Sequence, residues 1–361
     1  MKAAVLFEVP GRLQIEDVVV DKPRRGEVLV KIVASGLCHS DLHAMRGQIE
    51  VPVPSVLGHE ASGIVTEVGP GVEDFHPGDH VLGFLAAYCG VCDYCLSGRP
   101  TLCRGNFSRD PDDTPRLRLT DGTPLSQFAG LAAFAEEMLV HEHRLVKIDP
   151  SIPLDRAALV GCAVPTGVGA VIRTARVPAG ATVAVIGCGG IGLNVIQGAT
   201  LAGARRIIAI DIDTGKLERA HDFGATDLVD NSNGDALEQV EGLLPGELGV
   251  DFSFEALGRV DTYQLAAALL RPGGTATLIG LPEPRTIPLP PDAFSGERKI
   301  QGCSMGSVRF PTDLPYLLGL YRSGRLKLDE LVSRKIRLEE INDGYDGIGR
   351  GDIARSVIVF D

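Results

Sequence analysis

The sequence predicts a protein with two domains, one rich in β-strands and one of α/β type with a parallel sheet. Its 361 residues exceed what one small core needs. Its first part holds short β-branched runs bounded by Gly and Pro, and its middle alternates strand-like and helix-like segments. Hydrophobic residues make up 44% and charged residues 23%, which is ordinary for a globular chain and excludes wholesale disorder.

The β-rich part is read from three short apolar runs. These lie at residues 28–33, 63–69 and 79–83, and their spacing predicts a compact antiparallel or barrel-like domain. Residues 104–123 have no apolar periodicity and contain the sequence Asp-Pro-Asp-Asp-Thr-Pro. We therefore expect an exposed loop there.

The α/β part begins with a buried-strand run at residues 181–186, which leads through a Gly-rich turn into a helix of small residues. A second strand follows at 206–210, so that strand, helix and strand form a βαβ unit with parallel strands. The pattern repeats to about residue 279 and predicts a doubly wound sheet. A helix at 313–321 and a closing strand at 356–360 come after it.

Charge and hydropathy exclude several classes of protein. Lys plus Arg number 35 and Asp plus Glu 47, a net charge of −12 that argues against a nucleic-acid binder. We see no apolar run of the roughly 18 residues that a membrane span needs, and expect no membrane partner. Glu8 and Pro10 interrupt the first apolar run too early for a secretory leader, so we expect a cytoplasmic protein.

Four of the eight cysteines lie in one stretch of 15 residues, at Cys89, Cys92, Cys95 and Cys103. In a reducing compartment such a cluster is more typical of a metal site than of disulfides. Four thiolates complete the tetrahedral shell of zinc, so the expected role is structural. An iron–sulfur cluster is the main alternative because spacing alone does not fix the metal, and a redox dithiol is a weaker one.

A dinucleotide-binding turn is predicted by G-x-G-x-x-G between a strand and a helix, with Gly187, Gly189, Gly190 and Gly192 in the turn. The first glycine permits the tight turn, Gly189 lets the backbone approach a pyrophosphate, and Gly192 lets helix and strand pack closely. The next strand ends in Asp211, whose carboxylate would accept ribose hydroxyls and repel a 2′-phosphate. This favours NAD over NADP. A Gly-rich turn of an unrelated α/β domain is the alternative.

Three dispersed residues form a second candidate metal site. Cys38, His59 and Cys162 could bind zinc and leave a fourth position for substrate, which is the catalytic arrangement. Spacing cannot show that they converge, and a lone Cys or His is more often an ordinary core residue.

Taken together, these motifs resemble those of the zinc-dependent alcohol dehydrogenases of the medium-chain dehydrogenase/reductase superfamily. The resemblance runs nearly end to end and includes the segment at residues 58–63, Gly-His-Glu-Ala-Ser-Gly. It implies a GroES-like catalytic domain at 1–163 and 305–361, with a structural-zinc loop at about 86–104. A Rossmann cofactor domain is then expected at 164–304.

The resemblance also implies roles for the site residues. Cys38, His59 and Cys162 would bind catalytic zinc, with Glu60 close behind the metal and Asp41 orienting the His59 ring. Ser40 would take the alcohol proton and His43 would pass it on through the cofactor ribose. The residues expected at the cofactor itself are His39, Thr166, Lys216 and Arg355, the last two having solvated surface charges as the alternative.

The resemblance leaves the substrate open. Leu85, Phe84 and Phe134 are the candidate pocket residues, and we expect a primary alcohol of medium length or an aryl alcohol. The third ligand lies in Gly161-Cys162-Ala163, where relatives often carry Gly-Cys-Gly. The long loop after Cys103 favours a homodimer by analogy.

Three alternative functions remain. A thiol-adduct formaldehyde dehydrogenase belongs to the same superfamily and would use basic residues such as Arg104 and Arg109 for the carboxylates of the adduct. An enzyme that recycles permanently bound NAD is also possible within the family. From another class comes a non-enzymatic sensor that binds NAD or zinc and has kept the fold.

Overall fold

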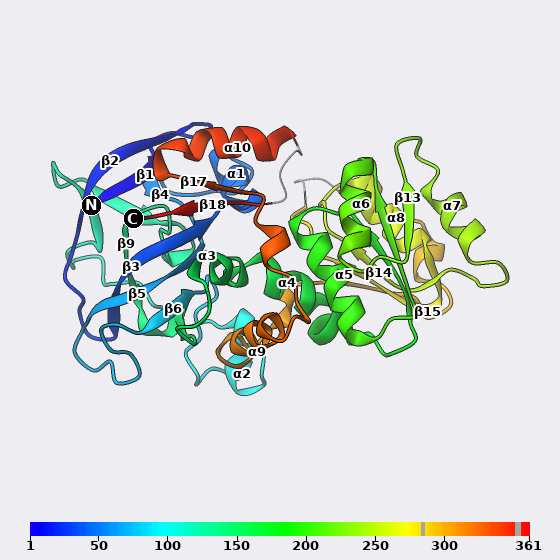
Figure 1. The fold of residues 1–361 in the computed structure, drawn as a ribbon, viewed down its shortest axis with the longest axis horizontal. Coiled ribbons are helices and arrows are strands. Elements are labelled where there is room, and N and C mark those ends of the chain that lie inside the picture. Colours follow the sequence, from blue (N-terminus) through cyan, green and yellow to red (C-terminus); the bar gives the residue numbers. More distant parts are fainter. Residues whose placement is uncertain (283–285, 351–354) are drawn as a thin grey trace. The chain divides into compact units, whose positions relative to one another are not determined.

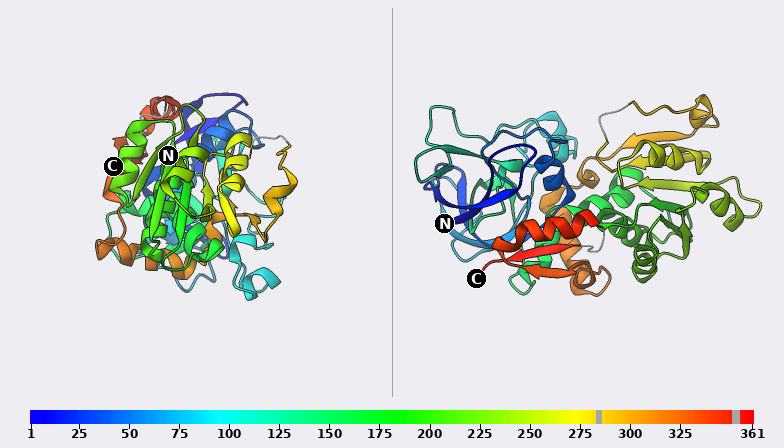
Figure 2. Two further views of the ribbon diagram at one scale, coloured as in Figure 1. Left: turned by 90° about the vertical axis from the view of Figure 1, so that its right-hand side faces the viewer. Right: turned by 90° about the horizontal axis from the view of Figure 1, so that it is seen from above.

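The computed structural model describes residues 1–282, 286–350 and 355–361 (Figure 1). The chain forms two units, Met1–Cys162 with Arg309–Asp361, and Ala163–Val308. The boundaries read from the sequence, after residues 163 and 304, lie close to these. Both chain termini belong to the first unit (Figure 2).

The first unit holds a small barrel and a larger sheet. The barrel has the strand order β1 (Lys2–Leu6), β2 (Leu13–Val20), β7 (Leu117–Leu119), β8 (Pro124–Gln127) and β4 (Ser55–Val56). The sheet runs β10 (Leu145–Lys147), β6 (His80–Gly83), β5 (Glu60–Val68), β3 (Glu27–Gly36), β18 (Ser356–Val359) and β17 (Arg334–Ile336), and β9 (Glu137–His141) also pairs with β3. The predicted β-rich domain is confirmed.

Alternating side chains build the core of the larger sheet. Along β3, Val28, Val30, Ile32 and Ala34 are all fully buried, which is the period of two that a strand with one face on a core requires. β3 pairs antiparallel with β5, and Gly36 lies opposite Glu60. The ends of these two strands therefore lie together, where the predicted metal ligands follow and precede them.

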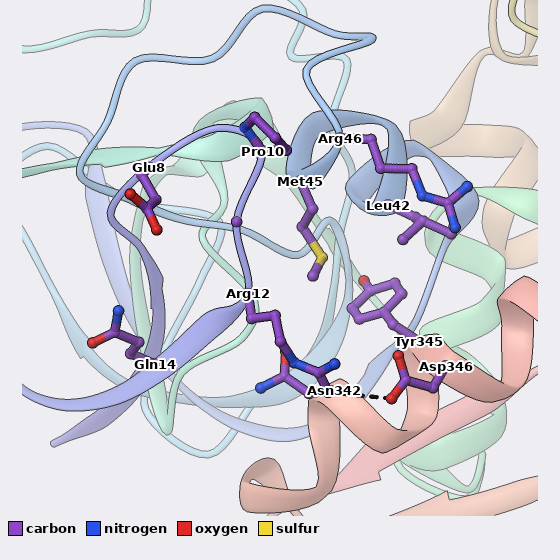
Figure 3. A pocket seen from close by; sticks show the side chains of 11 residues that line it. Glu8, Pro10, Arg12, Gln14, Leu42, Met45, Arg46, Asn342, Tyr345 and Asp346 are labelled. Atoms are coloured by element: carbon purple, nitrogen blue, oxygen red, sulfur yellow. Dashed lines mark hydrogen bonds and ion pairs between the residues drawn. The ribbon is translucent and has the colours of Figure 1, made fainter.

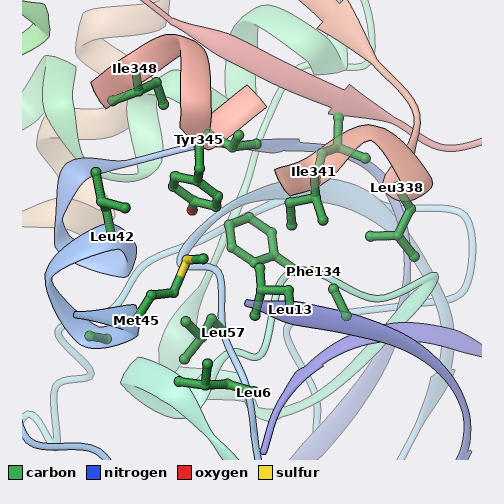
Figure 4. Packing of buried hydrophobic residues seen from close by; sticks show 14 of the residues in the cluster. Leu6, Leu13, Leu42, Met45, Leu57, Phe134, Leu338, Ile341, Tyr345 and Ile348 are labelled. Atoms are coloured by element: carbon green, nitrogen blue, oxygen red, sulfur yellow. The ribbon is translucent and has the colours of Figure 1, made fainter. Parts of the chain in front are cut away.

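Short helices connect and cover the strands of this unit. The helices are α1 (His39–Met45), α2 (Asp93–Leu96), α3 (Leu154–Ala157), α9 (Phe310–Arg322) and α10 (Ile341–Arg350). Single 3₁₀ turns include η1 (Pro100–Leu102), η2 (Phe128–Gly130), η3 (Glu142–Arg144), η4 (Ala158–Gly161), η8 (Asp329–Leu331) and η9 (Leu338–Glu340). Leu6, Leu42, Met45, Leu57, Phe134 and Tyr345 belong to one buried cluster that joins these elements (Figure 4).

The segment predicted as an exposed loop, residues 104–123, is only partly one. Its residues 117–119 form β7 and pair with β2. The side chain of Arg109 is 8% exposed because it binds two carboxylates, from Asp21 and Glu27. Buried ion pairs rather than apolar residues attach this segment to the rest of the unit. Hydrophobic periodicity cannot predict such contacts.

The second unit is a six-stranded parallel sheet with helices along it. The strand order is β13 (Asp227–Asp230), β12 (Arg206–Asp211), β11 (Thr182–Ile186), β14 (Val250–Glu255), β15 (Leu270–Leu278) and β16 (Lys299–Gly302). Its helical segments are α4 (Ala163–Gly169), η5 (Ala170–Ala175), α5 (Gly190–Ala202), α6 (Thr214–Asp222), α7 (Ala236–Leu243), α8 (Val260–Ala268), η6 (Pro291–Phe294) and η7 (Met305–Ser307). Figure 1 shows α5 and α6 in front of the strands and α8 behind them. This is the doubly wound order, so the predicted fold class is confirmed.

The start of one strand differs from the sequence-based expectation. The strand expected to begin after Pro272 and two glycines begins earlier, at Leu270, because Leu270 pairs with Val250 before a shift in register.

No helix in the described ranges is by itself long and apolar enough to cross a membrane, although the consecutive segments Leu154–Gly161 and Ala163–Ala175 pass that test as a bent pair.

Candidate active site and metal centres

Three ligand candidates from distant segments meet in the first unit. Cys38 follows β3, His59 precedes β5, and Cys162 follows η4. Together with Glu60, they bring one sulfur, nitrogen or carboxylate oxygen each to within 4.8 Å of one another. Their exposed fractions are only 5%, 1% and 6% for Cys38, His59 and Cys162. The convergence that spacing could not show is thus present in the fold.

Asp41 orients the imidazole of His59. Its Oδ1 lies 3.1 Å from Nδ1 of His59 and accepts the backbone N–H of Gly58 at 2.9 Å. Because Nδ1 is occupied, Nε2 is the nitrogen left for a metal. Gly58 is required here, since its φ is +91° and a Cβ would lie 2.6 Å from the backbone nitrogen of Phe134.

Glu60 and Arg355 form a buried ion pair beside the ligands. Nη1 of Arg355 lies 3.1 Å from Oε1 of Glu60 and donates to the Leu37 carbonyl at 2.9 Å. The solvated surface charge considered for Arg355 is wrong, since the residue is 5% exposed. Burial raises the pKa of Glu60 to about 8 although Arg355 opposes the rise. Gly36 makes room for this carboxylate, because a Cβ there would lie 2.2 Å from Oε2 of Glu60.

The thiols of this site differ in their acidity. The hydrogen bond with Cys162 lowers the pKa of Cys38 well below its usual range, burial opposes this, and the charges of His59 and Arg355 add to the lowering. The same hydrogen bond, together with burial, raises the pKa of Cys162 well above its usual range. The protein alone therefore favours a thiolate at Cys38, which is the form of cysteine that binds metal, and a bound cation would favour it at Cys162 as well. Two thiolates and a neutral imidazole balance a divalent ion and suit zinc. The donor set fits a three-ligand zinc site, with Glu60 at its edge.

The predicted proton relay lies on α1. Ser40 is half-buried, and its Oγ lies 3.8 Å from Sγ of Cys38. His43 is one turn further along the same helix, and its Nδ1 contacts Oε1 of Gln48. No direct bond joins Ser40 and His43 in the part of the chain that the structure describes. His39 begins the helix and is exposed.

The four-cysteine loop also gathers its sulfurs. Cys89 and Cys95 lie 4.0 Å apart at Sγ, as do Cys92 and Cys103. Four sulfurs around one zinc at about 2.3 Å would be about 3.8 Å apart. Backbone N–H groups point at three of the sulfurs, and those of Arg104 and Cys95 lower the pKa of Cys92 to about 6. The loop fits a tetrahedral ion with no position left for substrate.

The second unit carries the predicted dinucleotide turn. Gly187 has φ +91°, Gly189 has open space where a Cβ would be, and a Cβ on Gly192 would lie 1.8 Å from the Gly187 carbonyl oxygen. Gly189 caps α5, so Gly190 and the residues after it present N–H groups at the helix start. These three environments match the tight turn, the ligand approach and the close packing that the motif requires.

The residues expected around this turn lie in the same unit. Asp211 ends β12, and its Oδ2 accepts the N–H of Cys188 at 2.7 Å. Burial raises the pKa of Cys188, Asp211 adds to the rise and Lys216 opposes it, so both charges act at the turn. Thr166 is buried in α4, with its Oγ1 3.7 Å from the sulfur of Met305. Its predicted place near the nicotinamide stays a prediction.

The sequence analysis did not identify an aromatic residue that packs against the metal ligand His59. The ring of Phe128 lies edge-on to that of His59, with centroids 5.7 Å apart. By contrast, Phe84 stacks on Phe310 and Phe134 packs against Tyr345, and both are fully buried. They are core side chains rather than the expected pocket residues. Phe128 belongs to the segment after β8, where no spacing rule ties it to His59.

The two arginines considered for a thiol adduct already have carboxylate partners. Arg104 pairs with Asp93 at 2.5 Å, and Arg109 pairs with Glu27 and Asp21. Arg109 is buried against its two carboxylates and is not available to an adduct, whereas Arg104 lies in an exposed surface pair.

Comparisons with known proteins agree with both units. The family model described as the alcohol dehydrogenase GroES-like domain matches residues 24–150, and that of the zinc-binding dehydrogenases matches 190–322. The alcohol dehydrogenase class-3 of Cereibacter sphaeroides is 38% identical over 99% of both chains. The S-(hydroxymethyl)glutathione dehydrogenase of Paracoccus denitrificans is 35% identical, also over 99% of both. The benzyl alcohol dehydrogenase structure from Acinetobacter calcoaceticus superposes with a TM-score of 0.93 at 30% identity, covering 100% of this chain and 99% of its own.

Proposed function

Because the chain belongs to the zinc-dependent alcohol dehydrogenases of the medium-chain dehydrogenase/reductase superfamily, we propose that it oxidises a primary alcohol of medium length, or an aryl alcohol, to the aldehyde and passes the hydride reversibly to NAD. The observation that carries this proposal is the meeting of Cys38, His59 and Cys162 at one buried point. Three protein ligands leave a position open for a substrate oxygen, which a structural site does not.

The residues around the three zinc ligands have different roles in the proposed reaction. When bound, zinc supplies a Lewis acid for the substrate oxygen and the nicotinamide exchanges the hydride. Ser40 Oγ would accept the alcohol proton, and the His43 imidazole would hand it to solvent. Asp41 keeps Nε2 of His59 free for the metal, and Arg355 balances the charge of Glu60.

An aryl or medium-chain substrate is supported by the aromatic ring beside the ligands. Phe128 supplies an apolar face next to His59. A solved relative of high similarity is named for benzyl alcohol. NAD is favoured over NADP because the Asp211 carboxylate at the end of β12 would repel a 2′-phosphate.

The thiol-adduct formaldehyde dehydrogenase remains the second candidate, since one relative carries the name of that activity. The burial of Arg109 against Asp21 and Glu27 speaks against it. The sensor is a weaker candidate, because the relay residues Ser40 and His43 would have no use in a protein that only binds zinc or NAD.

A panel of alcohols tests the proposal. We expect the purified protein to reduce NAD, and much less NADP, with benzyl alcohol and with straight-chain primary alcohols. Formaldehyde should react no faster in the presence of glutathione. Turnover of formaldehyde only with glutathione would establish the second candidate. No turnover with any alcohol by protein that contains two zinc ions per chain would contradict the proposed oxidation and leave the sensor as the candidate.

The cellular location and the assembly belong to the same proposal. We infer a cytoplasmic homodimer, from the reducing conditions that the unpaired cysteines need and from the long segment after Cys103. Light scattering on the purified protein measures the assembly directly, and a monomer or a tetramer would contradict it.

A further inference from the structure

A cavity next to β8 in the first unit has both a charged and an apolar wall. Its volume is about 520 Å³, and three guanidinium groups and two aromatic rings line it, those of Arg109, Arg116, Arg144, Phe107 and Phe128. A pocket of this kind suits a small molecule with an apolar body and an anionic end, provided that at least one of the arginines is free to bind it.

Two of the three arginines already have carboxylate partners. Arg109 pairs with Asp21 at 2.6 Å and with Glu27 at 2.5 Å, and Arg116 pairs with Glu27 at 2.7 Å. The side chains of Arg109 and Arg116 are only 8% and 10% exposed. Two cations thus meet two anions, so this group adds no net charge to the wall of the cavity.

Arg144 differs, because no carboxylate of the described residues pairs with it. Its Nη1 donates to the carbonyls of Leu85 at 2.5 Å and Ala129 at 2.9 Å, and its buried Nε has no acceptor within the described chain. Burial lowers the pKa of Arg144 to about 10 and the charge of Arg116 adds to the lowering, so Arg144 still carries its charge at neutral pH. A half-buried cation without a counter-ion is costly, and a bound anion would offset this cost.

The local fold holds the guanidinium group of Arg144 in one place. The two carbonyls that accept from Nη1 come from different segments, Leu85 after β6 and Ala129 in η2. Gly130 leaves the necessary space, since its φ is +66° and a Cβ there would lie 2.5 Å from Cζ of Arg144. The centroid of the Phe107 ring lies 6.0 Å from the same Cζ. The cation is therefore oriented before a ligand arrives, which reduces the entropy lost on binding.

One further carboxylate, that of Glu50, also lines the cavity. Glu50 is exposed, and within the described chain it makes no ion pair with Arg144. Because water screens an exposed charge, Glu50 weakens the attraction of an anion to Arg144 without cancelling it.

The larger cavity of the first unit lacks such a cation. It measures about 840 Å³ and lies between α1 and α10 (Figure 3). Its two arginines, Arg12 and Arg46, are both exposed, and two carboxylates, those of Glu8 and Asp346, line the same cavity. Arg12 pairs with Asp346 at 3.2 Å, as the dashed line in Figure 3 marks. Charges that are balanced and in water do not call for a bound anion.

We propose that the cavity at Arg144 is an anion site, in which Arg144 binds the carboxylate of a small molecule whose apolar body lies against Phe107 and Phe128. A guanidinium group offers N–H donors in a planar fork that matches carboxylate oxygens. Two sources could supply this carboxylate, the alcohol substrate itself or a separate organic acid. The first source rests on the proposed function. It is supported by Phe128, which lines the cavity and has its ring centroid 5.7 Å from that of His59.

Benzoate tests the site, and benzamide is its neutral counterpart. In calorimetric titrations of the zinc-loaded protein, Arg144→Gln should weaken benzoate binding about 10- to 100-fold, the range for one hydrogen bond to a charged group. Benzamide binding should not change, and benzoate bound to zinc would not depend on Arg144. Arg118→Gln is the matched control, because Arg118 also has a buried nitrogen without an acceptor in the described chain and is not among the residues that line this cavity.

Glu50→Gln tests the same charge interaction in the opposite direction. It removes an exposed negative charge and does not touch the hydrogen bonds of Arg144 to Leu85 and Ala129. Benzoate binding should become about 2- to 5-fold tighter, the range for an exposed charge pair, while benzamide binding stays the same.

Two substrates distinguish the sources of the carboxylate. If the alcohol carries it, the wild type should oxidise 4-(hydroxymethyl)benzoate with a higher kcat/KM than benzyl alcohol. Arg144→Gln should then lower the ratio of the two values about 10-fold. A ratio that Arg144→Gln leaves unchanged, with benzoate binding still weakened, would assign the cavity to a separate organic acid.

Benzoate binding that is equal in the wild type and in Arg144→Gln, or absent from the wild type, would overturn the anion site. An equal loss of benzoate and benzamide binding in Arg144→Gln would also overturn it, because Arg144 would then only join the segments of Leu85 and Ala129. The titrations need no turnover. Failure of the anion site can therefore be told from failure of the proposed function.

Discussion

The four-cysteine loop and the Cys38–His59–Cys162 site gather metal ligands by opposite means. The loop takes four sulfurs from 15 consecutive residues, and backbone N–H groups already point at three of them. The other site takes its ligands from three distant segments and buries them almost completely. Ligands that are close in sequence can form a metal site with little tertiary structure. The buried site, in contrast, forms only when β3, β5 and η4 are all in place. The loop should therefore be the more independent of the two.

The largest expected effect separates the two sites by function. His59→Ala should reduce alcohol turnover at least about 10⁴-fold, because the zinc ion that binds the substrate oxygen loses one of its three protein ligands. The loop should keep its ion, so zinc analysis should fall from two to one per chain while circular dichroism stays unchanged. Full activity in His59→Ala would show that the converging residues are not the catalytic site.

The next effect distinguishes proton transfer from metal binding. Ser40→Ala should lower turnover by about 10²- to 10⁴-fold, the range typical of a lost proton-transfer group. Both zinc ions should remain, because Ser40 is not a ligand and its Oγ lies 3.8 Å from Sγ of Cys38. Loss of one zinc ion in this variant would mean that Ser40 supports the site rather than the proton relay.

A change in the loop should act on stability instead of chemistry. Cys103→Ser removes one of four ligands, and because metal binding contributes to folding, the melting temperature should fall by about 10 °C. Turnover at room temperature should stay within a few-fold of wild type. Calorimetry and a standard assay measure the two quantities. A variant that melts like the wild type would show that the loop holds no metal that matters for stability.

The contrast also explains what the sequence could predict. Spacing alone identified the four cysteines and the turn from Gly187 to Gly192, because each is a local motif with its own geometry. Whether Cys38, His59 and Cys162 meet depends on the pairing of β3 with β5, in which Gly36 lies opposite Glu60. The resemblance named these ligands, and only the fold shows them within reach of one another.

Residues that depend on tertiary packing escaped the sequence reading. From the sequence alone, Arg355 could have been a surface charge. It is buried against Glu60 because it directly precedes β18, which pairs with β3. Phe128 faces His59 from a single 3₁₀ turn. No periodicity links these pairs, because each joins elements far apart in the chain.

The smallest effect concerns Glu27, which links the segment after the loop to the strand leading to Cys38. Glu27 begins β3 and pairs with Arg109 at 2.5 Å and with Arg116 at 2.7 Å. Burial alone would raise the pKa of Glu27, but hydrogen bonds from Arg109, from the backbone of Arg24 and from Arg116 lower it to about 2.

A lowered carboxylate pKa adds stability above the unfolded value of about 4.5, and this stability is lost as the pH falls through about 2. Glu27→Gln should therefore cost ~1–2 kcal/mol at pH 7 after allowance for screening by solvent. Urea unfolding at pH 7, 5, 4 and 3 measures the free energy of unfolding of both proteins. The difference between the wild type and the variant should become smaller below pH 4.5. A gap that stays constant with pH would mean that Glu27 holds the segment by packing and neutral hydrogen bonds. The ion pairs of Glu27 would then contribute nothing to the attachment of the segment after the four-cysteine loop to β3.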